Sequence, residues 1–192
     1  MSVEYSTSDG TATVASGDYS ETSVSDPAHG EVFVKANGSI AYFPDEGYLG
    51  ADSFTYKAND GSDSSESATV SITAKDLTAP TVTVTSPASG ATGVAPGSNV
   101  TATFSEAMKA NSISIDTFKL YASGSTTPIA ATVSYDPVAK KIILDPSINL
   151  KRGATYKAVV TSEAKDLADN ALDQFPSVTG NQMKVWSFTM RS

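Results

Sequence analysis

The most regular feature of this sequence is a series of short apolar runs separated by turn-forming residues. In the first part of the chain the runs are EVFVKA (31–36), SIAYFP (39–44), SFTYKAN (53–59) and ESATVSITA (66–74). They are rich in Val, Ile, Phe, Tyr and Thr, and Gly, Asn, Asp or Pro residues bound them. Several alternate apolar with polar positions, and this two-residue period predicts half-buried β-strands.

One pair of runs carries a hairpin signal. Asn37-Gly38 separates FVKA from SIAYF, and a type I′ turn favours this dipeptide because both of its central positions need a positive φ. We therefore expect a tight hairpin there. Within SIAYF, Ile40 and Tyr42 share one face and Ala41 and Phe43 the other. We expect the aromatic side chains of these strands to belong to a core rather than to a binding platform.

The same pattern resumes after residue 80 and gives about seven further strand candidates. Their spacing and the proline residues at several run ends are typical of an antiparallel sandwich. Two other stretches, SEAMKANSI (105–113) and SEAKDLADNAL (162–172), suggest single helical turns only. The fold class predicted is therefore all-β, with two tandem immunoglobulin-like antiparallel sandwiches. The seven runs are TVTVTSP (81–87), NVTATFS (99–105), FKLYA (118–122), ATVSYDP (131–137), KKIILDP (140–146), TYKAVVT (155–161) and VWSFTM (185–190).

Charge changes abruptly between the two series of strands. Residues 1–76 contain thirteen acidic side chains against three lysines, a net charge of −10, whereas residues 77–192 have a net charge of +2. The change coincides with a polar stretch from Asp76 to Pro80 that resembles a linker. We predict two domains, at 1–76 and 77–192.

Composition excludes several function classes. The 192 residues contain no cysteine, one histidine and one tryptophan, so disulfides, thiolate metal sites and thiol nucleophiles are ruled out. The acidic first domain argues against nucleic-acid binding, which needs a basic surface. No apolar stretch is long enough to cross a membrane, and the start does not resemble a secretion signal, so we expect no membrane insertion.

We predict no catalytic and no cofactor-binding residues. His29 is the single candidate for a general base, and it lies in a turn, DPAHGEV, without a nucleophile motif nearby. We therefore interpret it as a structural turn residue. Trp186, in an alternating run, is interpreted as a core residue of the second sandwich rather than a sugar platform.

The acidic loops of the first domain contain one candidate metal site. Asp60, Asp63 and Asp76 lie in or beside loops and the linker of the acidic domain, and carboxylates with backbone carbonyls can form an oxygen-only Ca²⁺ site. Calcium bound there would stiffen the joint between domains. The alternative interpretation is a solvated acidic face, and no EF-hand pattern is present.

Both halves resemble modules of bacterial surface proteins. The phrases DPAHG, ANGSIAYFP and GYLGADSFTYKANDG (26–61) resemble the cadherin-like, immunoglobulin-type repeats of large adhesins. The phrases SGATGV, FSEAM, LKRGATY, KDLADN and WSF, in order between residues 89 and 188, are similar to the bacterial immunoglobulin-like domain associated with S-layer proteins. Residues 3–20 depart from the start of the adhesin repeat, which leaves the completeness of the first domain in question.

These patterns together predict a non-catalytic spacer and adhesion fragment of a secreted or cell-surface bacterial protein, possessing calcium-stiffened modules. Its partners would be neighbouring immunoglobulin-like repeats of the same chain and a surface glycan or protein. The alternative is a carbohydrate- or protein-binding accessory module of an exported enzyme. Such a module would expose aromatic side chains, and the first to inspect are Tyr48, Tyr121 and Phe175.

Overall fold

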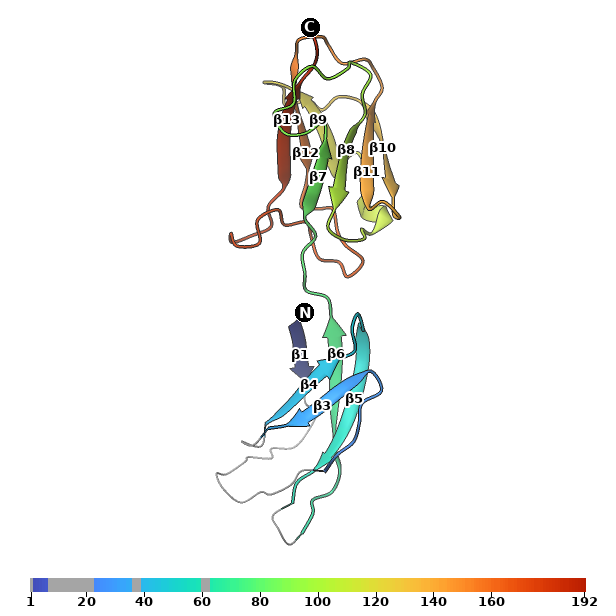
Figure 1. The fold of residues 1–192 in the computed structure, drawn as a ribbon, viewed down its shortest axis with the longest axis vertical. Coiled ribbons are helices and arrows are strands. Elements are labelled where there is room, and N and C mark those ends of the chain that lie inside the picture. The colour runs from blue at the N-terminus through green and yellow to red at the C-terminus, as the bar shows by residue number, and fades with distance from the viewer. Residues whose placement is uncertain (1, 7–22, 36–38, 60–62) are drawn as a thin grey trace. The chain divides into compact units, whose positions relative to one another are not determined.

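The computed structural model describes residues 2–6, 23–35, 39–59 and 63–192 (Figure 1). It divides into two compact units, residues 1–77 and residues 78–192. Every regular element in the described ranges is a β-strand except one short 3-10 turn, so the all-β prediction is confirmed. Within those ranges, no helix has the length and apolar character needed to span a membrane.

The first unit contains two antiparallel sheets. One has the strand order β1-β6-β5-β2, and the other is the hairpin β3-β4. Strand β5 pairs with β6 from Gly50 opposite Ala74 to Tyr56 opposite Ala68. The strands are β1 (Ser2–Ser6), β2 (Ser23–Val24), β3 (Gly30–Val34), β4 (Ile40–Pro44), β5 (Gly50–Lys57) and β6 (Ala68–Lys75).

Alternation along these strands builds a small core. Four described side chains are buried together, Tyr42, Phe54, Val70 and Ile72. In β6 every second residue from Val70 to Ala74 is buried while its neighbours are exposed, as the two-residue period predicted. The interpretation as core residues is thus confirmed for Tyr42 and Phe54.

The aromatic side chains on the other face of the β3–β4 hairpin are exposed. Phe43 is 58% exposed and Phe33 is 51% exposed, and their rings meet edge to face with centroids 5.6 Å apart. The prediction of a core position is therefore wrong for Phe43. A two-stranded sheet has two faces, and this hairpin packs only the face that carries Tyr42 against the core.

The predicted hairpin partners pair as expected. Val34 lies opposite Ile40, and the Lys35 N–H donates to the carbonyl of Ser39 over 2.8 Å. The turn dipeptide Asn37-Gly38 itself lies outside the described residues.

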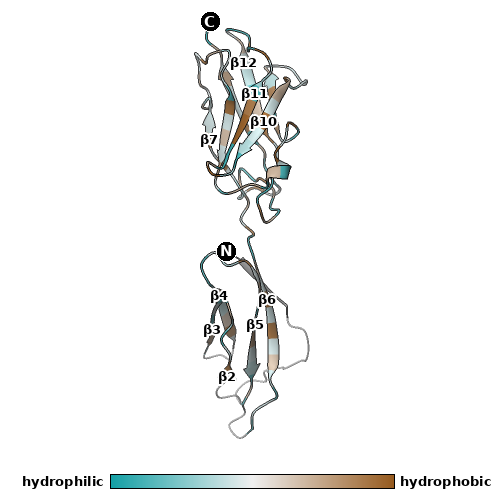
Figure 2. Cartoon of the chain, turned by 90° about the vertical axis from the view of Figure 1, so that its right-hand side faces the viewer, coloured by the Kyte–Doolittle hydropathy of each residue, from teal (hydrophilic) through white to brown (hydrophobic). Residues whose placement is uncertain are grey.

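The second unit is an antiparallel sandwich with seven strands in two sheets. One sheet has the order β10-β11-β8-β7 and the other β13-β12-β9. The apolar centre of β11 stands out in Figure 2. Of the two helical turns predicted, only the first forms, as the 3-10 turn η1 (Ala110–Ser112). The strands are β7 (Val82–Ser86), β8 (Val100–Phe104), β9 (Phe118–Ala122), β10 (Ala131–Asp136), β11 (Lys141–Pro146), β12 (Thr155–Val160) and β13 (Lys184–Thr189).

The two sheets enclose one continuous core. Trp186 is 3% exposed, stacks near Phe118 with ring centroids 5.9 Å apart, and donates its indole N–H to the carbonyl of Pro87. This confirms its interpretation as a core residue. The other buried members include Val82, Val100, Ala102, Phe104, Met108, Leu120, Ile142, Leu144, Leu150, Tyr156, Ala158, Val160, Ala164, Leu172, Phe188 and Met190.

Candidate functional site

The residues predicted to bind a metal do not form a described cluster. Asp60 lies outside the described residues. Asp63 precedes strand β6 and Asp76 follows it, and the eight residues of β6 extend over about 26 Å. These two carboxylates therefore lie at opposite ends of the strand, so the structure does not bring them together.

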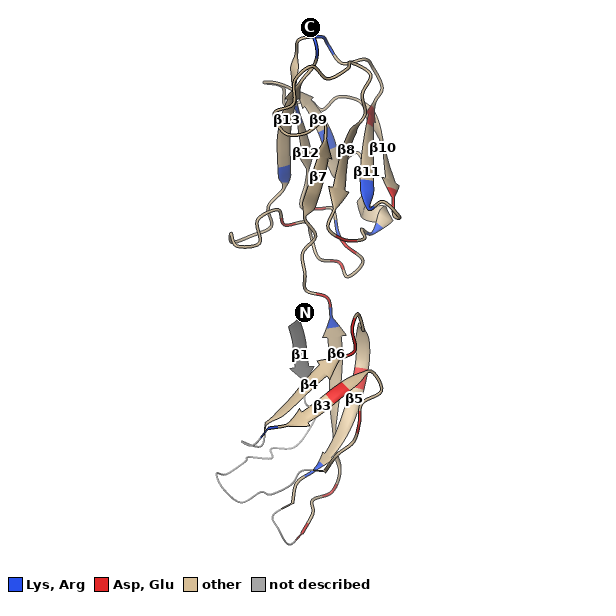
Figure 3. Ribbon diagram, in the orientation of Figure 1, with Lys and Arg blue, Asp and Glu red and all other residues tan. Residues whose placement is uncertain are grey.

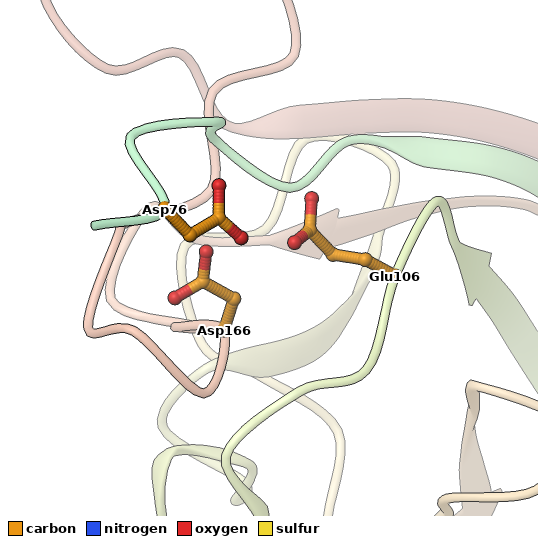
Figure 4. Close-up of side chains that lie close together, drawn as sticks. All are labelled: Asp76, Glu106 and Asp166. Carbon is orange, nitrogen blue, oxygen red and sulfur yellow. The ribbon is translucent and has the colours of Figure 1, made fainter. Parts of the chain in front are cut away.

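A different pair of carboxylates does converge, within the second unit. Glu106 and Asp166 each offer one oxygen atom, and these oxygens lie within 4.8 Å of each other (Figure 4). Glu106 follows β8 by two residues, and Asp166 lies in the KDLADN loop. The two residues are 60 positions apart in the sequence, so sequence proximity gave no signal for this pair.

Asp166 is first of all a structural residue. Its side chain is 1% exposed. One carboxylate oxygen, Oδ1, accepts the backbone N–H groups of Ala168 and Asn170, each over 2.8 Å, while Oδ2 accepts the Asn170 side-chain amide. A carboxylate offers about four lone-pair positions, so three of the four are engaged in closing the loop. Asp166 thus caps the backbone of its own loop, as Asp side chains commonly do in tight turns.

The same loop is tied to its surroundings by two further contacts. Asn170 also donates to the carbonyl of Thr78 over 3.2 Å, which holds the first residue of the second unit against the loop. Asp169 forms a salt bridge of 2.7 Å with Lys109. The hydrogen bond and the charge of Lys109 lower the pKa of the Asp169 carboxyl.

Chemically, the carboxylates of Glu106 and Asp166 are suited to a hard cation. Carboxylate oxygens are preferred Ca²⁺ ligands, and a site needs six to eight oxygens in all. Asp166 has about one lone-pair position left for a cation beside its loop contacts. Such an ion would therefore draw most of its ligands from Glu106, backbone carbonyls and water.

A second buried aspartate, in the first unit, was not singled out by the sequence analysis. Asp52 lies on β5 and its carboxylate accepts the N–H groups of Ala28 and His29, the hydroxyl of Tyr42 at 2.9 Å and the N–H of Ser53. Burial alone would raise its pKa, but these four hydrogen bonds outweigh the desolvation and lower the pKa of Asp52. The sequence did contain a signal for this residue. Alternation puts Asp52 on the same inward face of the strand as Phe54, and a carboxylate at such a position needs hydrogen-bond donors around it.

This carboxylate fixes the position of His29. The His29 carbonyl also accepts the hydroxyl of Tyr42 and the N–H of Asp45, and its ring stacks on Tyr48 with centroids 4.2 Å apart. All three hydrogen bonds of His29 that the structure describes use its backbone. Its contacts thus support the interpretation as a structural turn residue.

The three aromatic residues proposed for inspection differ in their surroundings. Tyr48 stacks on His29 and donates its hydroxyl to the carbonyl of Ala51 over 2.6 Å. Tyr121 lies on β9 under the ammonium group of Lys157, 5.2 Å from the ring centroid. Phe175 is 57% exposed, in a loop that the carboxylate of Asp173 closes.

Two family models together match nearly the whole chain. A family model described as "Bacterial Ig-like domain" matches residues 76–190, and one described as "Bacterial Ig domain" matches residues 2–73. No curated protein matches the chain.

Similar solved structures include three of the S-layer protein SbsC, each 16% identical to this chain. They are the N-terminal part of the protein (TM-score 0.44, covering 59% of this chain and 24% of that chain), the fragment rSbsC(31-844) (0.43, 59% and 14%) and domains 1–6 (0.44, 60% and 14%). The chain thus spans a quarter or less of those proteins.

The two family models confirm that both halves resemble bacterial immunoglobulin-like domains. The first model alone covers more than half of the chain, from Asp76 to Met190. The chain belongs to the bacterial immunoglobulin-like domain family and contains two such domains in tandem.

Proposed function

We propose that this chain is a load-bearing spacer segment of an extracellular or cell-surface bacterial protein. Two folded domains in series set a reach, and they keep that reach only if they resist unfolding when the chain is pulled. The adhesin-type character of the first domain, with neighbouring repeats of the same chain and a surface glycan or protein as partners, is part of this proposal.

The observation that carries the proposal is a parallel pairing near the two ends of the second domain. Residues 90–94 run parallel to residues 187–191, with Val94 bridged to Met190. We call these two segments the terminal clamp. Four backbone hydrogen bonds join them, namely Gly90 N–H to Ser187 O (2.8 Å), Thr189 N–H to Ala91 O (2.8 Å), Val94 N–H to Thr189 O (3.2 Å) and Arg191 N–H to Val94 O (2.8 Å).

The direction of this pairing decides how it responds to tension. A force on the N-terminal side pulls residues 90–94 toward their N-terminus, while a force on the C-terminal side pulls residues 187–191 toward their C-terminus. Because the segments are parallel, the two forces slide them past each other along their axis. The hydrogen bonds then share the load and must fail together, whereas an antiparallel hairpin pulled at its open end loses its bonds one at a time.

Single-molecule force spectroscopy of the whole chain tests the proposal. Arg191→Pro removes the N–H donor to Val94 from the clamp, and Ser123→Pro removes an equivalent 2.9 Å bond to Thr155 outside it. Each lost bond costs about 1 kcal/mol of equilibrium stability. We expect similar small losses in denaturant unfolding for both variants, but a lower unfolding force for Arg191→Pro alone.

The second domain is identified in these traces by its extension, about 3.5 Å for each of its residues. Equal unfolding forces in the two variants would contradict the clamp. Unfolding of the unmodified domain at the lowest measurable force would contradict the load-bearing role itself.

Calcium binding stays a proposal, and its candidate ligands in the second domain are Glu106 and Asp166. Its support is the convergence of these two carboxylates and the preference of Ca²⁺ for such oxygens. Glu106 is the residue to change, because Asp166 also holds its own loop and its loss would destabilise the domain without any metal.

Thermal unfolding of the second domain with EDTA, Ca²⁺ or Mg²⁺ tests this. A ligand at a hundredfold excess over its Kd stabilises the folded state by about 2.7 kcal/mol. We expect a Ca²⁺-specific rise of the midpoint that Glu106→Gln removes and that Glu163→Gln, a change of an exposed acid outside the cluster, retains. Equal midpoints in EDTA and Ca²⁺ would rule the site out.

A further inference from the structure

One sheet of the second domain lacks acidic residues. Strands β9, β12 and β13 have the sequences FKLYA, TYKAVV and KVWSFT, with Lys119, Lys157 and Lys184 and no Asp or Glu. The opposite sheet has mixed charge, because Asp136 lies directly across from Lys141. Figure 3 shows no red on β9, β12 or β13. In a chain with a net charge of −8, such a sheet is an exception.

The strand register gathers the basic groups on the outer face of this sheet. Lys157 on β12 lies directly opposite Tyr121 on β9, and Lys119 lies two residues before Tyr121 on the same face. Lys157 and Lys119 are therefore diagonal neighbours, with Cα atoms about 7–8 Å apart. Lys157 also covers the Tyr121 ring, 5.2 Å from its centroid, which holds its ammonium group over the sheet.

Hydroxyl groups occupy the neighbouring positions of the same face. Ser187 lies across from Lys157 on β13, and Thr155 and Thr189 form the next row, with their hydroxyl oxygens 2.9 Å apart. We call Lys119, Tyr121, Lys157, Ser187 and the Thr155–Thr189 pair the lysine face. It is an open surface of cationic and hydroxyl groups around one aromatic ring.

The lysine side chains of this face are not neutralised by the domain itself. Residues 78–192 are all described, and neither Lys119 nor Lys157 forms a salt bridge with any residue that the structure describes. The basic character continues past Thr155 and Thr189, where the Gly153 N–H donates to the carbonyl of Arg191, so that Arg152 and Arg191 come from adjoining segments. A partner with spaced negative charges is therefore complementary to this face.

We propose that the lysine face binds a linear anionic glycan, a polymer of the polyuronate type with hydroxyl groups between its carboxylates. The hydroxyls of Ser187 and Tyr121 match the hydroxyls of such a chain, and the two lysines match its charges. A protein partner fits less well, because lysine is depleted in protein interfaces. In addition, Val185 is the only exposed large apolar side chain among the outward residues of the three strands.

A nucleic acid also fits less well. Duplex DNA carries about one charge per 1.7 Å, which the acidic chain as a whole repels, whereas a polyuronate spaces its charges more widely. The single aromatic ring of the face is covered by Lys157 and is not free to stack on bases. The proposal is independent of the load-bearing role.

Titration calorimetry of the whole chain with de-esterified polygalacturonate tests the proposal, with dextran as the uncharged probe. The variant Lys119→Gln/Lys157→Gln keeps side-chain length and removes both charges. The matched control, Lys140→Gln/Lys141→Gln, removes two charges from the β10–β11 region. We expect the chain to bind polygalacturonate and the first variant to bind it about tenfold more weakly. The slope of the binding constant against salt concentration should fall by about two charges in that variant. The control should bind as the unmodified chain does.

Four results would overturn the proposal. The first is no heat of binding at low salt, and the second is equal weakening in the two variants, which would mean unspecific attraction. The third is equally tight binding of duplex DNA, and the fourth is salt-sensitive self-association in light scattering that Lys119→Gln/Lys157→Gln abolishes. Either of the last two would assign the face to another class of partner.

Discussion

Asp52 and Asp166 illustrate how single residues support the two domains. Both carboxylates are buried, and both are surrounded by N–H or hydroxyl donors from a nearby loop. A buried carboxylate is tolerated only when such donors replace water. Each aspartate therefore helps to fix the loop that donates to it.

Asp52→Asn tests this role in the first domain. The substitution replaces an acceptor oxygen with an NH₂ group facing donors, and we expect it to destabilise the domain by about 1–3 kcal/mol at neutral pH. Glu46→Gln, a change of an exposed acid in the turn after β4, should have little effect. Hydrogen exchange of peptides from β5 and β6, read by mass spectrometry, reports this domain alone.

The stabilising effect of Asp52 should also depend on pH. The pKa of Asp52 is lowered in the folded state, so its stabilising effect is complete above the unfolded pKa of about 3.9 and is lost as pH falls through the folded value. The unmodified domain should thus lose more protection than Asp52→Asn between neutral and strongly acidic pH. Parallel losses in the two proteins would contradict this assignment.

At the scale of elements, each strand of the second domain divides its residues between core and surface. Ile142 and Leu144 are fully buried, while Ile143 between them faces out beside Thr101 and Ser134. Phe118 on β9 is also fully buried and lies against Trp186 of β13. The ring of Phe118 thus links the two edge strands of the three-stranded sheet through the core.

Phe118→Ala is expected to destabilise the second domain by about 3–5 kcal/mol, because it leaves a cavity among residues that cannot collapse into it. Trp186 is the single tryptophan of the chain, so its fluorescence in a denaturant titration follows this domain specifically. Val138→Ala, at a side chain 92% exposed in the β10–β11 turn, is the control and should change stability by less than about 0.5 kcal/mol. A loss below about 1 kcal/mol for Phe118→Ala would mean that the two rings do not form the core contact described.

At the scale of the whole molecule, the two domains differ in the extent of their cores and in their charge. The second domain has a continuous core that both of its sheets share, while the described core of the first has four buried members. The charges are also divided, with most of the acidic excess in residues 1–76. The terminal clamp and the lysine face both belong to the second domain, so both proposals about function are tests of that domain.

Sequence alone determined the fold class, most of the strands and the bacterial immunoglobulin-like family. Alternating apolar positions and turn residues are local signals, and they were sufficient for β3 to β6 and for all seven strands of the second domain. Face assignment was less complete, since Phe43 was expected in a core although it lies on the exposed face of the β3–β4 hairpin. A run that is apolar at consecutive positions does not indicate which of its two faces is inside.

Only the tertiary structure decided which distant residues meet. The Glu106–Asp166 pair, the Ala28 and His29 donors to Asp52 and the parallel terminal clamp all join segments far apart in sequence. Sequence spacing suggested Asp60, Asp63 and Asp76 instead, but a strand extends by about 3.3 Å per residue and so separates acids that are close in sequence. Strand pairing brings together residues from opposite ends of a domain, and that pairing depends on the whole core rather than on any one segment.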